Sequence, residues 1–407
     1  MVEGQRGGVS RLTRTMRAFN PVFAARSTTI FETMSRLAQA EGAINLGQGF
    51  PDEDGPVDIR ERAGAALRDG PNQYPLMAGL PELRQAVADH EKRFYGLDID
   101  WSRQTLVTSG ATEALAAAFL AFLQPGDEVI LIEPFYDSYL AMIEAAGARA
   151  VYVSMQPPGP AAGWTLPRER LAQAFGPKTK LIAINTPHNP TGAVLSDDDL
   201  AFLAGLVEEN DAYVICDEVY EHIVFDGATH RPLMTLPGMD ERCVRIGSAG
   251  KTFSLTGWKV GYVVGAPDVI AVVAKAHQFL TFTTPPALQA AVAYGLHKSD
   301  GYFQGLAYDM QERRDILTAG LKEAGFAVAA SAGTYFLTVD ISAIGYVGTD
   351  AEFCEEITRN AKVAAVPVSA FYSVSAAEAP TNYVRFCFCK SAETLRVAAE
   401  RLKAYTA

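Results

Sequence analysis

The chain has 407 residues, a formal net charge of −12 and 49% hydrophobic residues. That length suits two cores, or one large α/β core with a smaller appendage. The negative charge argues against nucleic acid and anionic membranes as main partners, since both attract basic surfaces. No apolar run is long enough to span a membrane. With nucleic acid and membranes disfavoured as partners, a small-molecule site is the favoured class of function.

Cysteine and histidine usage predicts a reducing compartment, the cytoplasm, and no metal. The cysteines number five, include no C-x-x-C pair and lie mostly in apolar runs, so free buried thiols are expected. The six histidines show no ligand-like spacing. Residues 1–26 carry five arginines against one acid, which mildly resembles a transit segment, but a terminal packing arm is the preferred interpretation.

The first elements alternate between helix and strand. Apolar residues at helical spacing predict a helix over 30–40, and Gly42 supplies a stop. Residues 44–52 read as a short strand that breaks into a Gly/Pro loop, whose backbone N–H groups could approach an anion. A second helix is expected over 80–95, with Pro81 in its first turn.

A strand over 105–110 runs directly into an alanine-rich helix that starts at Ala111. This arrangement is typical of phosphate sites, because free N–H groups and the helix dipole both point at the anion. The turn contains neither G-x-G-x-x-G nor a P-loop lysine. Nicotinamide dinucleotides and nucleoside triphosphates are therefore disfavoured.

Further apolar runs end in polar or aromatic residues. They span 128–133, 180–185, 212–216 and 242–246. Such runs are typical of a buried, largely parallel sheet with helices on both faces and a ligand site at its carboxyl edge. Asp217 follows the third run, and a small-residue turn after the fourth presents Lys251.

Beyond about Ser299 the pattern changes to a smaller α+β domain. Helices over 266–280 and 287–296 precede the change; a helix over 311–322, a strand pair within 326–340 and a strand over 382–389 follow it. The expected division is an N-terminal arm with part of the small domain (1–48), a large cofactor-binding domain (49–298) and a small C-terminal domain (299–407).

A phosphate cradle, Asp217 and Lys251 at one sheet edge define a ligand with a phosphate, a basic ring nitrogen and an aldehyde. A lysine amine forms a Schiff base when burial or a nearby charge, such as that of Lys259, lowers its pKa. A buried carboxylate keeps a ring nitrogen protonated. Pyridoxal 5′-phosphate has these features. A solvated loop lysine and a helix N-cap aspartate are the structural alternatives.

An ordered set of motifs resembles the class I aminotransferases, which have the pyridoxal-phosphate-dependent transferase fold type I. The motifs are Asn189-Pro190-Thr191-Gly192, Asp217-Glu218-Val219-Tyr220, Ser248-Ala249-Gly250-Lys251, Thr256-Gly257-Trp258-Lys259 and, near the C-terminus, Arg385. The resemblance covers the chain from about Phe31 onward. It implies an α/β fold with a mostly parallel sheet in the large domain, a smaller α+β domain and pyridoxal 5′-phosphate as cofactor.

The resemblance also implies roles for individual residues. Lys251 would be the Schiff-base lysine and proton carrier, and Asp217 would pair with the pyridine nitrogen. Asn189 and Tyr220 would hydrogen-bond the phenolic oxygen of the ring. The remaining cofactor contacts would come from Gly110, Ala111, Thr112, Ser248 and Lys259 around the phosphate, with Tyr136 stacked on the ring.

Arg385 would hold the α-carboxylate of the substrate through a bidentate fork, with Asn189 nearby. Other stretches, at 45–52, 72–74 and 133–139, resemble the glutamine, methionine and kynurenine aminotransferase group, as does a lysine at position 259. By this resemblance the side-chain pocket is lined by Phe31, Tyr74, Thr112 and Phe282, with room left at Gly49.

The expected reaction moves the amino group of methionine, glutamine or an aromatic or kynurenine-type amino acid to a 2-oxo acid. One alternative is an N-succinyldiaminopimelate aminotransferase, whose substrate needs a cation for its distal carboxylates. Another is a cysteine-conjugate β-lyase. The resemblance further implies a homodimer in which Tyr74 reaches the phosphate of the neighbouring subunit's site. A regulator of this fold would carry a DNA-binding module, and no N-terminal segment is long enough for one.

Overall fold

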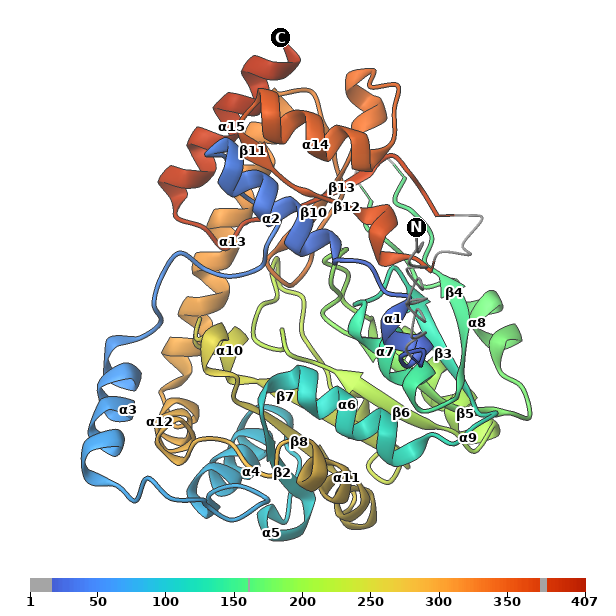
Figure 1. The fold of residues 1–407 in the computed structure, drawn as a ribbon, viewed down its shortest axis with the longest axis vertical. Helices are drawn as coiled ribbons and strands as arrows, with labels where there is room; N and C mark the ends of the chain where they lie inside the picture. The colour runs from blue at the N-terminus through green and yellow to red at the C-terminus, as the bar shows by residue number, and fades with distance from the viewer. Residues whose placement is uncertain (1–16, 160–161, 374–378) are drawn as a thin grey trace, which may run out of the picture.

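A computed structural model of the chain describes residues 17–159, 162–373 and 379–407 (Figure 1). Most of the arginine-rich stretch, residues 1–16, lies outside these ranges. Its described end includes helix α1 (Pro21–Ala24), which contacts α7 (Ser138–Ala145). Arg26 pairs there with Glu144 at 2.7 Å. In the described residues no helix is long and apolar enough to cross a membrane.

A seven-stranded sheet with the order β2-β8-β7-β6-β5-β3-β4 forms the centre of the molecule. Its strands are β2 (Thr105–Thr108), β3 (Glu128–Glu133), β4 (Arg149–Ser154), β5 (Thr179–Asn185), β6 (Tyr213–Asp217), β7 (Cys243–Ser248) and β8 (Gly261–Gly265). Every neighbouring pair is parallel except the two that involve β8. The predicted mostly parallel sheet is confirmed. Strand β7 continues two residues beyond the predicted end, so Ser248 belongs to the strand.

Helices cover both faces of this sheet (Figure 1). One face carries α6 (Gly110–Phe122), α7 and α11 (Pro267–Leu280); the other carries α3 (Val57–Asp69), α4 (Pro81–Tyr95), α8 (Arg168–Ala174), α9 (Asp197–Glu209) and α12 (Pro286–Leu296). Alternate residues of each strand supply the two cores. On β3, Val129 and Leu131 pack on the first side, whereas Ile130 and Ile132 pack on the second.

A second, four-stranded antiparallel sheet lies beside the large one, with the order β12-β13-β10-β9. Its strands are β9 (Ala327–Val328), β10 (Phe336–Asp340), β12 (Val366–Pro367) and β13 (Tyr383–Cys387). The neighbouring helices are α2 (Ile30–Glu41), α13 (Asp300–Glu323), α14 (Asp350–Asn360) and α15 (Ala392–Thr406). The short strand β1 (Ile44–Asn45) pairs with β11 (Val363–Ala364), so the N-terminal segment joins the C-terminal elements.

Helix α13 begins eleven residues before its predicted start at position 311. Gly301 and Gly305 weaken the helical signal of the sequence there, because glycine has a low helix propensity. Packing against α15 compensates for that propensity. A Cβ at Gly320 would lie 2.3 Å from the Cβ of Ala399, which shows how closely the two helices approach.

A buried ion cluster surrounds Arg245 beneath the central sheet's neighbouring strands. Arg245 on β7 is fully buried and pairs with Glu91, Glu218 and Glu221; its Nε lies 2.6 Å from Glu218 Oε2. The cluster therefore links β7 and the segment that follows β6 to α4. Removing one partner of such a buried cluster typically costs about 3 to 5 kcal/mol of folding free energy.

Candidate active site

A cavity of about 530 Å³ opens at the carboxyl ends of the parallel strands. Its volume suits a cofactor and a small substrate together. Among its lining residues are the predicted Phe31, Gly49, Gly110, Ala111, Thr112, Tyr136, Asn189, Asp217, Tyr220, Ser248, Lys251, Lys259 and Arg385. Of the predicted site residues, only Tyr74 and Phe282 lie outside it.

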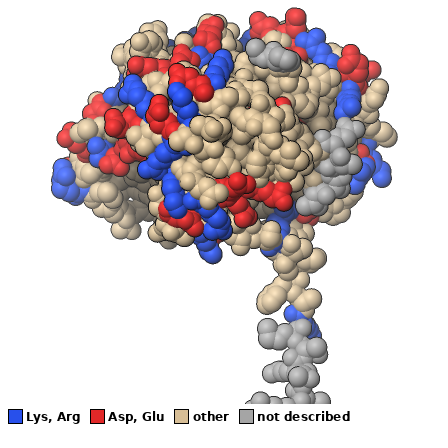
Figure 2. Space-filling view, turned by 90° about the horizontal axis from the view of Figure 1, so that it is seen from above, with Lys and Arg blue, Asp and Glu red and all other residues tan. Residues whose placement is uncertain are grey.

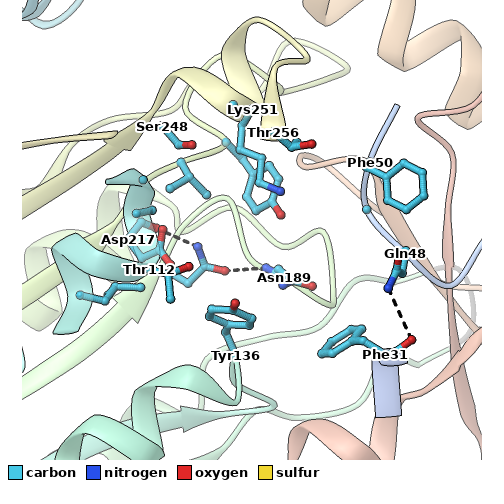
Figure 3. Close-up of a pocket in the computed structure, with 18 of the residues that line it drawn as sticks. Phe31, Gln48, Phe50, Thr112, Tyr136, Asn189, Asp217, Ser248, Lys251 and Thr256 are labelled. Carbon is cyan, nitrogen blue, oxygen red and sulfur yellow. Dashed lines mark hydrogen bonds between the residues drawn. The ribbon is translucent and has the colours of Figure 1, made fainter. Parts of the chain in front are cut away.

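Lys251 enters the cavity from α10 (Ala249–Thr252), the short helix that follows β7 (Figure 3). Its Nζ donates a hydrogen bond to Tyr335 Oη at 2.7 Å, and Tyr335 donates in turn to the carbonyl of Gly49 at 2.7 Å. Burial lowers the pKa of Lys251, and nearby acidic groups offset part of that effect. A lysine amine that loses its proton more readily is a better nucleophile toward an aldehyde.

Asp217 ends β6 and faces the same cavity (Figure 3). Its Oδ2 accepts a hydrogen bond from Tyr139 at 2.5 Å, whereas its Oδ1 is buried with no partner. Burial raises the pKa of this carboxyl to about 6, which a cationic partner would reverse. A carboxylate with one bonded and one open oxygen fits the protonated nitrogen of a heteroaromatic ring.

The predicted phosphate cradle consists of a helix N-terminus and a lysine. Gly110 starts α6 with φ +76°, and Lys259 has φ +53° in the turn before β8. The Lys259 Nζ lies 3.5 Å from the point where a Cβ on Gly110 would be. Gly261 makes this approach possible, because its own Cβ would lie 2.7 Å from the backbone of Gly110. The free N–H groups, the helix dipole and the ammonium suit a phosphate.

Arg385 comes from β13 of the smaller sheet and is almost fully buried. Its Nη1 donates to Asn189 Oδ1 at 2.7 Å and its Nη2 to the Gly47 carbonyl at 2.5 Å, while Nε is buried without a partner. Burial lowers its pKa to about 10. An arginine whose Nε–H is unpaired and whose other partners are two neutral oxygens keeps its positive charge uncompensated, so it is suited to bind a carboxylate.

The glycine loop after β1 differs from its predicted use. The N–H groups of Gly47 and Gln48 donate to Asn45 Oδ1 at 2.9 and 3.2 Å, so these two donors are not free for an anion. The Gly47 carbonyl instead accepts from Arg385. The expectation that this loop presents N–H groups to an anion is wrong for these two residues, because the side chain of Asn45 takes them first.

Phe31, Gln48 and Phe50 form the side of the cavity away from Asp217 and Thr112, with Tyr136 below Lys251 (Figure 3). Gly49 has a packing role, since a Cβ there would lie 2.6 Å from the ring of Phe336. The lining also includes residues to which the sequence assigned no role, namely Thr29, Gln48, Phe50, Leu115, Asp137, Asn185, Val219, Gly250, Thr256, Val260 and Phe336.

Tyr74 and Phe282 lie together outside this chain's own cavity. Their rings meet edge to face with centroids 5.6 Å apart. Their exposed fractions are 84% and 41%, which is high for residues predicted to line a pocket. Within this chain they contribute nothing to the cavity.

Comparisons with known proteins agree with this geometry. The model of the family "Aminotransferase class I and II" matches residues 41–402. A probable N-succinyldiaminopimelate aminotransferase of Mycobacterium tuberculosis is 46% identical over 92% of this chain and 96% of its own length. The methionine aminotransferase of Escherichia coli is 41% identical over 92% and 95%, and human kynurenine–oxoglutarate transaminase 1 is 38% identical over 90% and 93%.

Solved structures show the same similarity. An N-succinyldiaminopimelate aminotransferase from Mycobacterium tuberculosis superimposes with a TM-score of 0.92 over 95% of this chain and 100% of that one, at 46% identity. A methionine aminotransferase from Escherichia coli gives a TM-score of 0.91 over 96% and 100%, at 40% identity.

Proposed function

Because this chain belongs to the class I and II aminotransferases, which are enzymes of fold type I that use pyridoxal 5′-phosphate, we propose that the cavity around Lys251 is the active site. One observation carries the proposal. Lys251, the open oxygen of Asp217 and the unpaired Nε of Arg385 all belong to this one site. Those groups match an aldehyde, a ring nitrogen and an α-carboxylate.

Each residue contributes a separate function. Bound pyridoxal 5′-phosphate supplies an electron sink for the substrate's α-carbon. Lys251 binds the aldehyde and accepts the proton that leaves the α-carbon. Asp217, oriented by Tyr139, keeps a proton on the ring nitrogen. Tyr335 accepts from the Lys251 ammonium and so positions it. Arg385 holds the substrate carboxylate.

The other proposed contacts with the cofactor come from residues that line the cavity. Asn189 and Tyr220, which line the cavity, would bind the ring's phenolic oxygen, and Tyr136 would stack on the ring. The phosphate would be held by Gly110, Ala111, Thr112, Ser248 and Lys259. The amino donor would leave as its 2-oxo acid while the cofactor retains the amino group. A second 2-oxo acid held by Arg385 would then receive that group as Lys251 returns the proton to the α-carbon.

The assignment of Lys251 has a direct test. Borohydride reduction of the holoenzyme should fix the cofactor to the peptide that contains Lys251, as read by mass spectrometry. Lys251→Ala should give no labelled peptide, whereas Lys259→Ala, the matched control, should bind less cofactor but keep the label on Lys251. A label on any other lysine would overturn the assignment.

For the amino donor we propose methionine, glutamine or an aromatic or kynurenine-type amino acid. Phe31 and Phe50 offer apolar contacts for a large neutral side chain. The cations in the described lining are Lys251, Lys259 and Arg385, all already assigned, so the wall holds none for a second carboxylate. Relatives named for methionine and kynurenine support the same class.

An N-succinyldiaminopimelate aminotransferase is the second candidate, and Arg26 favours it. Burial raises the pKa of Asp137, which lines the cavity, and the charge of Arg26 offsets part of that effect, although the Arg26 guanidinium pairs with Glu144. Arg26 is thus a cation beside the cavity that could exchange Glu144 for a distal carboxylate. The relative that is 46% identical carries this substrate's name.

Half-reaction spectroscopy separates the candidates. The holoenzyme is mixed with methionine, glutamine, kynurenine, phenylalanine or N-succinyldiaminopimelate, and the loss of the cofactor's absorption band is timed. Under the second candidate, Arg26→Ala should slow only the N-succinyldiaminopimelate reaction. Release of pyruvate and ammonia from a cysteine conjugate would indicate β-lyase activity.

We further propose a cytoplasmic homodimer with shared active sites. All five cysteines are free and buried, which suits a reducing compartment. The exposed pair of Tyr74 and Phe282 supports a second subunit as the place where these residues act.

A further inference from the structure

Two cysteines lie side by side at the end of β13. Cys387 is the last residue of β13, and Cys389 follows it by two residues. Their sulfur atoms are 3.1 Å apart, and both residues are fully buried. Neither has a part in the proposed reaction.

We propose that Cys387 and Cys389 form a redox-sensitive modification site, in which a hydroperoxide converts the two thiols to a reversible disulfide that distorts the substrate-carboxylate site. The disulfide itself depends only on the two cysteines. Its effect on activity rests on the proposed function.

The charges around the pair favour a thiolate at Cys387. Burial by itself would raise the pKa of Cys387, but hydrogen bonds from the Cys389 thiol and backbone, together with Arg385 and Lys390, lower it below its usual value. Burial raises the pKa of Cys389. A thiolate beside a neutral thiol is the arrangement of an attacking cysteine and a resolving cysteine.

The chemistry balances with the hydroperoxide as the oxidant. The Cys387 thiolate attacks one peroxide oxygen, the O–O bond breaks, and the products are a sulfenic acid and hydroxide. The Cys389 thiol then loses its proton and displaces hydroxide from the Cys387 sulfur, forming the S–S bond. In total two thiols are oxidised, and hydrogen peroxide is reduced to two waters.

The cysteine pair lies next to the active-site cavity. Cys387 is opposite Phe336 in the β10–β13 ladder, and Phe336 lines the active-site cavity. Burial lowers the pKa of Lys251, which also lines the cavity, and the charges of Cys389 and Cys387 offset part of that effect. The thiols therefore lie just behind the cavity wall, and the proposal requires hydrogen peroxide to reach them from the cavity.

Closing the disulfide would move residues that hold the site. Arg385 lies on the same strand, two residues before Cys387. The Cys387 N–H donates to the Leu46 carbonyl at 2.7 Å, and the Phe388 N–H to the Tyr335 carbonyl at 2.9 Å. Tyr335 is the partner of Lys251. Disulfides that close so small a ring are strained and easily reduced, which suits a reversible switch.

Peptide mapping of the holoenzyme tests the proposal directly. Trypsin cuts after Arg385 and Lys390, so both cysteines fall in the single five-residue peptide 386–390. After hydrogen peroxide and thiol alkylation, this peptide should carry no alkyl group and be two hydrogens lighter; dithiothreitol should restore double alkylation. Oxidation should lower kcat/KM for the amino donor by roughly 10- to 100-fold, the effect of a small misplacement of substrate, and dithiothreitol should recover it.

Cys389→Ser is the matched variant, since it keeps size and polarity but removes the resolving thiol. It should resist the reversible loss of activity, and its Cys387 should pass to the sulfinic acid. Cys354, buried elsewhere, should alkylate equally before and after peroxide once the protein is denatured.

Two results would overturn the proposal. One is a doubly alkylated peptide 386–390 after peroxide has acted on the wild-type holoenzyme. The other is a disulfide that forms without any change in kcat/KM, which would remove the link to the active site.

Discussion

Asp217 makes the stability of the cofactor-free protein depend on pH. Its folded-state pKa of about 6 lies above the unfolded value of 3.8, so folding favours the protonated carboxyl. The contribution of Asp217 to the free energy of unfolding is therefore fully present below pH 4 and is lost as the pH rises through 6. Its full size is about 3 kcal/mol.

Asp217→Asn should remove this dependence. Urea unfolding of the cofactor-free wild type and variant, from pH 4 to pH 7, should show the variant gaining up to about 3 kcal/mol relative to wild type as the pH rises. The comparison cancels the effects of His90, His188 and His222, whose pKa values burial lowers and which are present in both proteins. If the free energies of unfolding of wild type and variant instead changed in parallel with pH, burial would not raise the pKa of Asp217. In the holoenzyme a cation at Oδ1 should flatten the difference.

The proposed contact of Arg385 with the substrate carboxylate predicts an effect on the affinity for both substrates. Arg385→Lys should raise KM for the amino acid and the 2-oxo acid by roughly 10-fold or more, because an ammonium cannot make the two-pronged contact with a carboxylate. The cofactor spectrum should change little. Arg314→Lys, at a largely buried arginine that pairs with Asp226, is the control and should leave both KM values unchanged. Unchanged KM values in Arg385→Lys would make Arg385 structural.

At the scale of elements, the close crossing of β8 and α6 shapes the proposed phosphate cradle. A Cβ at Gly261 would lie 2.7 Å from the Gly110 carbonyl carbon and 2.9 Å from the Ala111 nitrogen, both backbone atoms that cannot rotate away. Gly261→Ala should therefore push β8 from the helix N-terminus. The dissociation constant for pyridoxal 5′-phosphate should rise about 10-fold or more, measured by fluorescence titration, since overpacking costs about 1 to 3 kcal/mol.

Gly257→Ala is the matched control for Gly261→Ala. It lies in the same connection, is exposed, and would place its Cβ in open space. Its affinity for the cofactor should equal that of wild type. Equal affinities for all three proteins would mean that the strand adjusts without moving the cradle.

Local patterns were sufficient to predict the elements that carry the site. Asp217 and Lys251 each follow an apolar strand, and parallel strands bring their carboxyl ends to one edge whatever their order. Strands β4 and β8 were not predicted. Strand β8 starts at a glycine directly after the Lys259 turn, so its sequence reads as a continuation of the loop motif.

Residues that support the site from a distance left no local signal. Tyr335 bonds Lys251 from 84 residues away, and Tyr139 bonds Asp217 from 78 residues away. A single sequence gives the residue type at these positions but not the contact. The same holds for Asn45, whose side chain accepts hydrogen bonds from the N–H groups of Gly47 and Gln48. The glycine pattern alone predicts that these N–H groups are available to an anion. The division into domains at 48 and 298 stays a prediction.

At the scale of the whole molecule, the distribution of charged and apolar side chains on the surface indicates which kinds of partner the protein suits. On the face in Figure 2, basic and acidic side chains are intermixed around a broad uncharged area, with no region of basic residues alone. Elsewhere, large apolar side chains are exposed near the ring pair defined by Tyr74 and Phe282; Leu76 and Phe279 are 63% and 86% exposed. Exposed apolar groups of this kind are typical of a protein interface.

These observations lead to a prediction about shared active sites. We assume that Tyr74 completes the cavity of a second subunit. A Tyr74→Ala chain then retains an intact Lys251, and a Lys251→Ala chain retains an intact Tyr74. In a hybrid dimer of the two, one site then carries both lesions and the other carries neither. Co-expression should recover activity, up to about half of the wild-type value per hybrid dimer, although each variant alone is impaired.

The hybrid should be isolated with two different affinity tags, so that its specific activity is measured free of the parent homodimers. A Tyr308→Ala chain co-expressed with Lys251→Ala is the control, because Tyr308 is also strongly exposed, at 69%, but has no predicted part in the site. That hybrid should show half of the wild-type activity from its one intact lysine, and Tyr308→Ala alone should be fully active. If Tyr74 acts within its own chain, every site of the Tyr74→Ala and Lys251→Ala hybrid keeps one lesion, and its activity should stay at the level of the impaired parents.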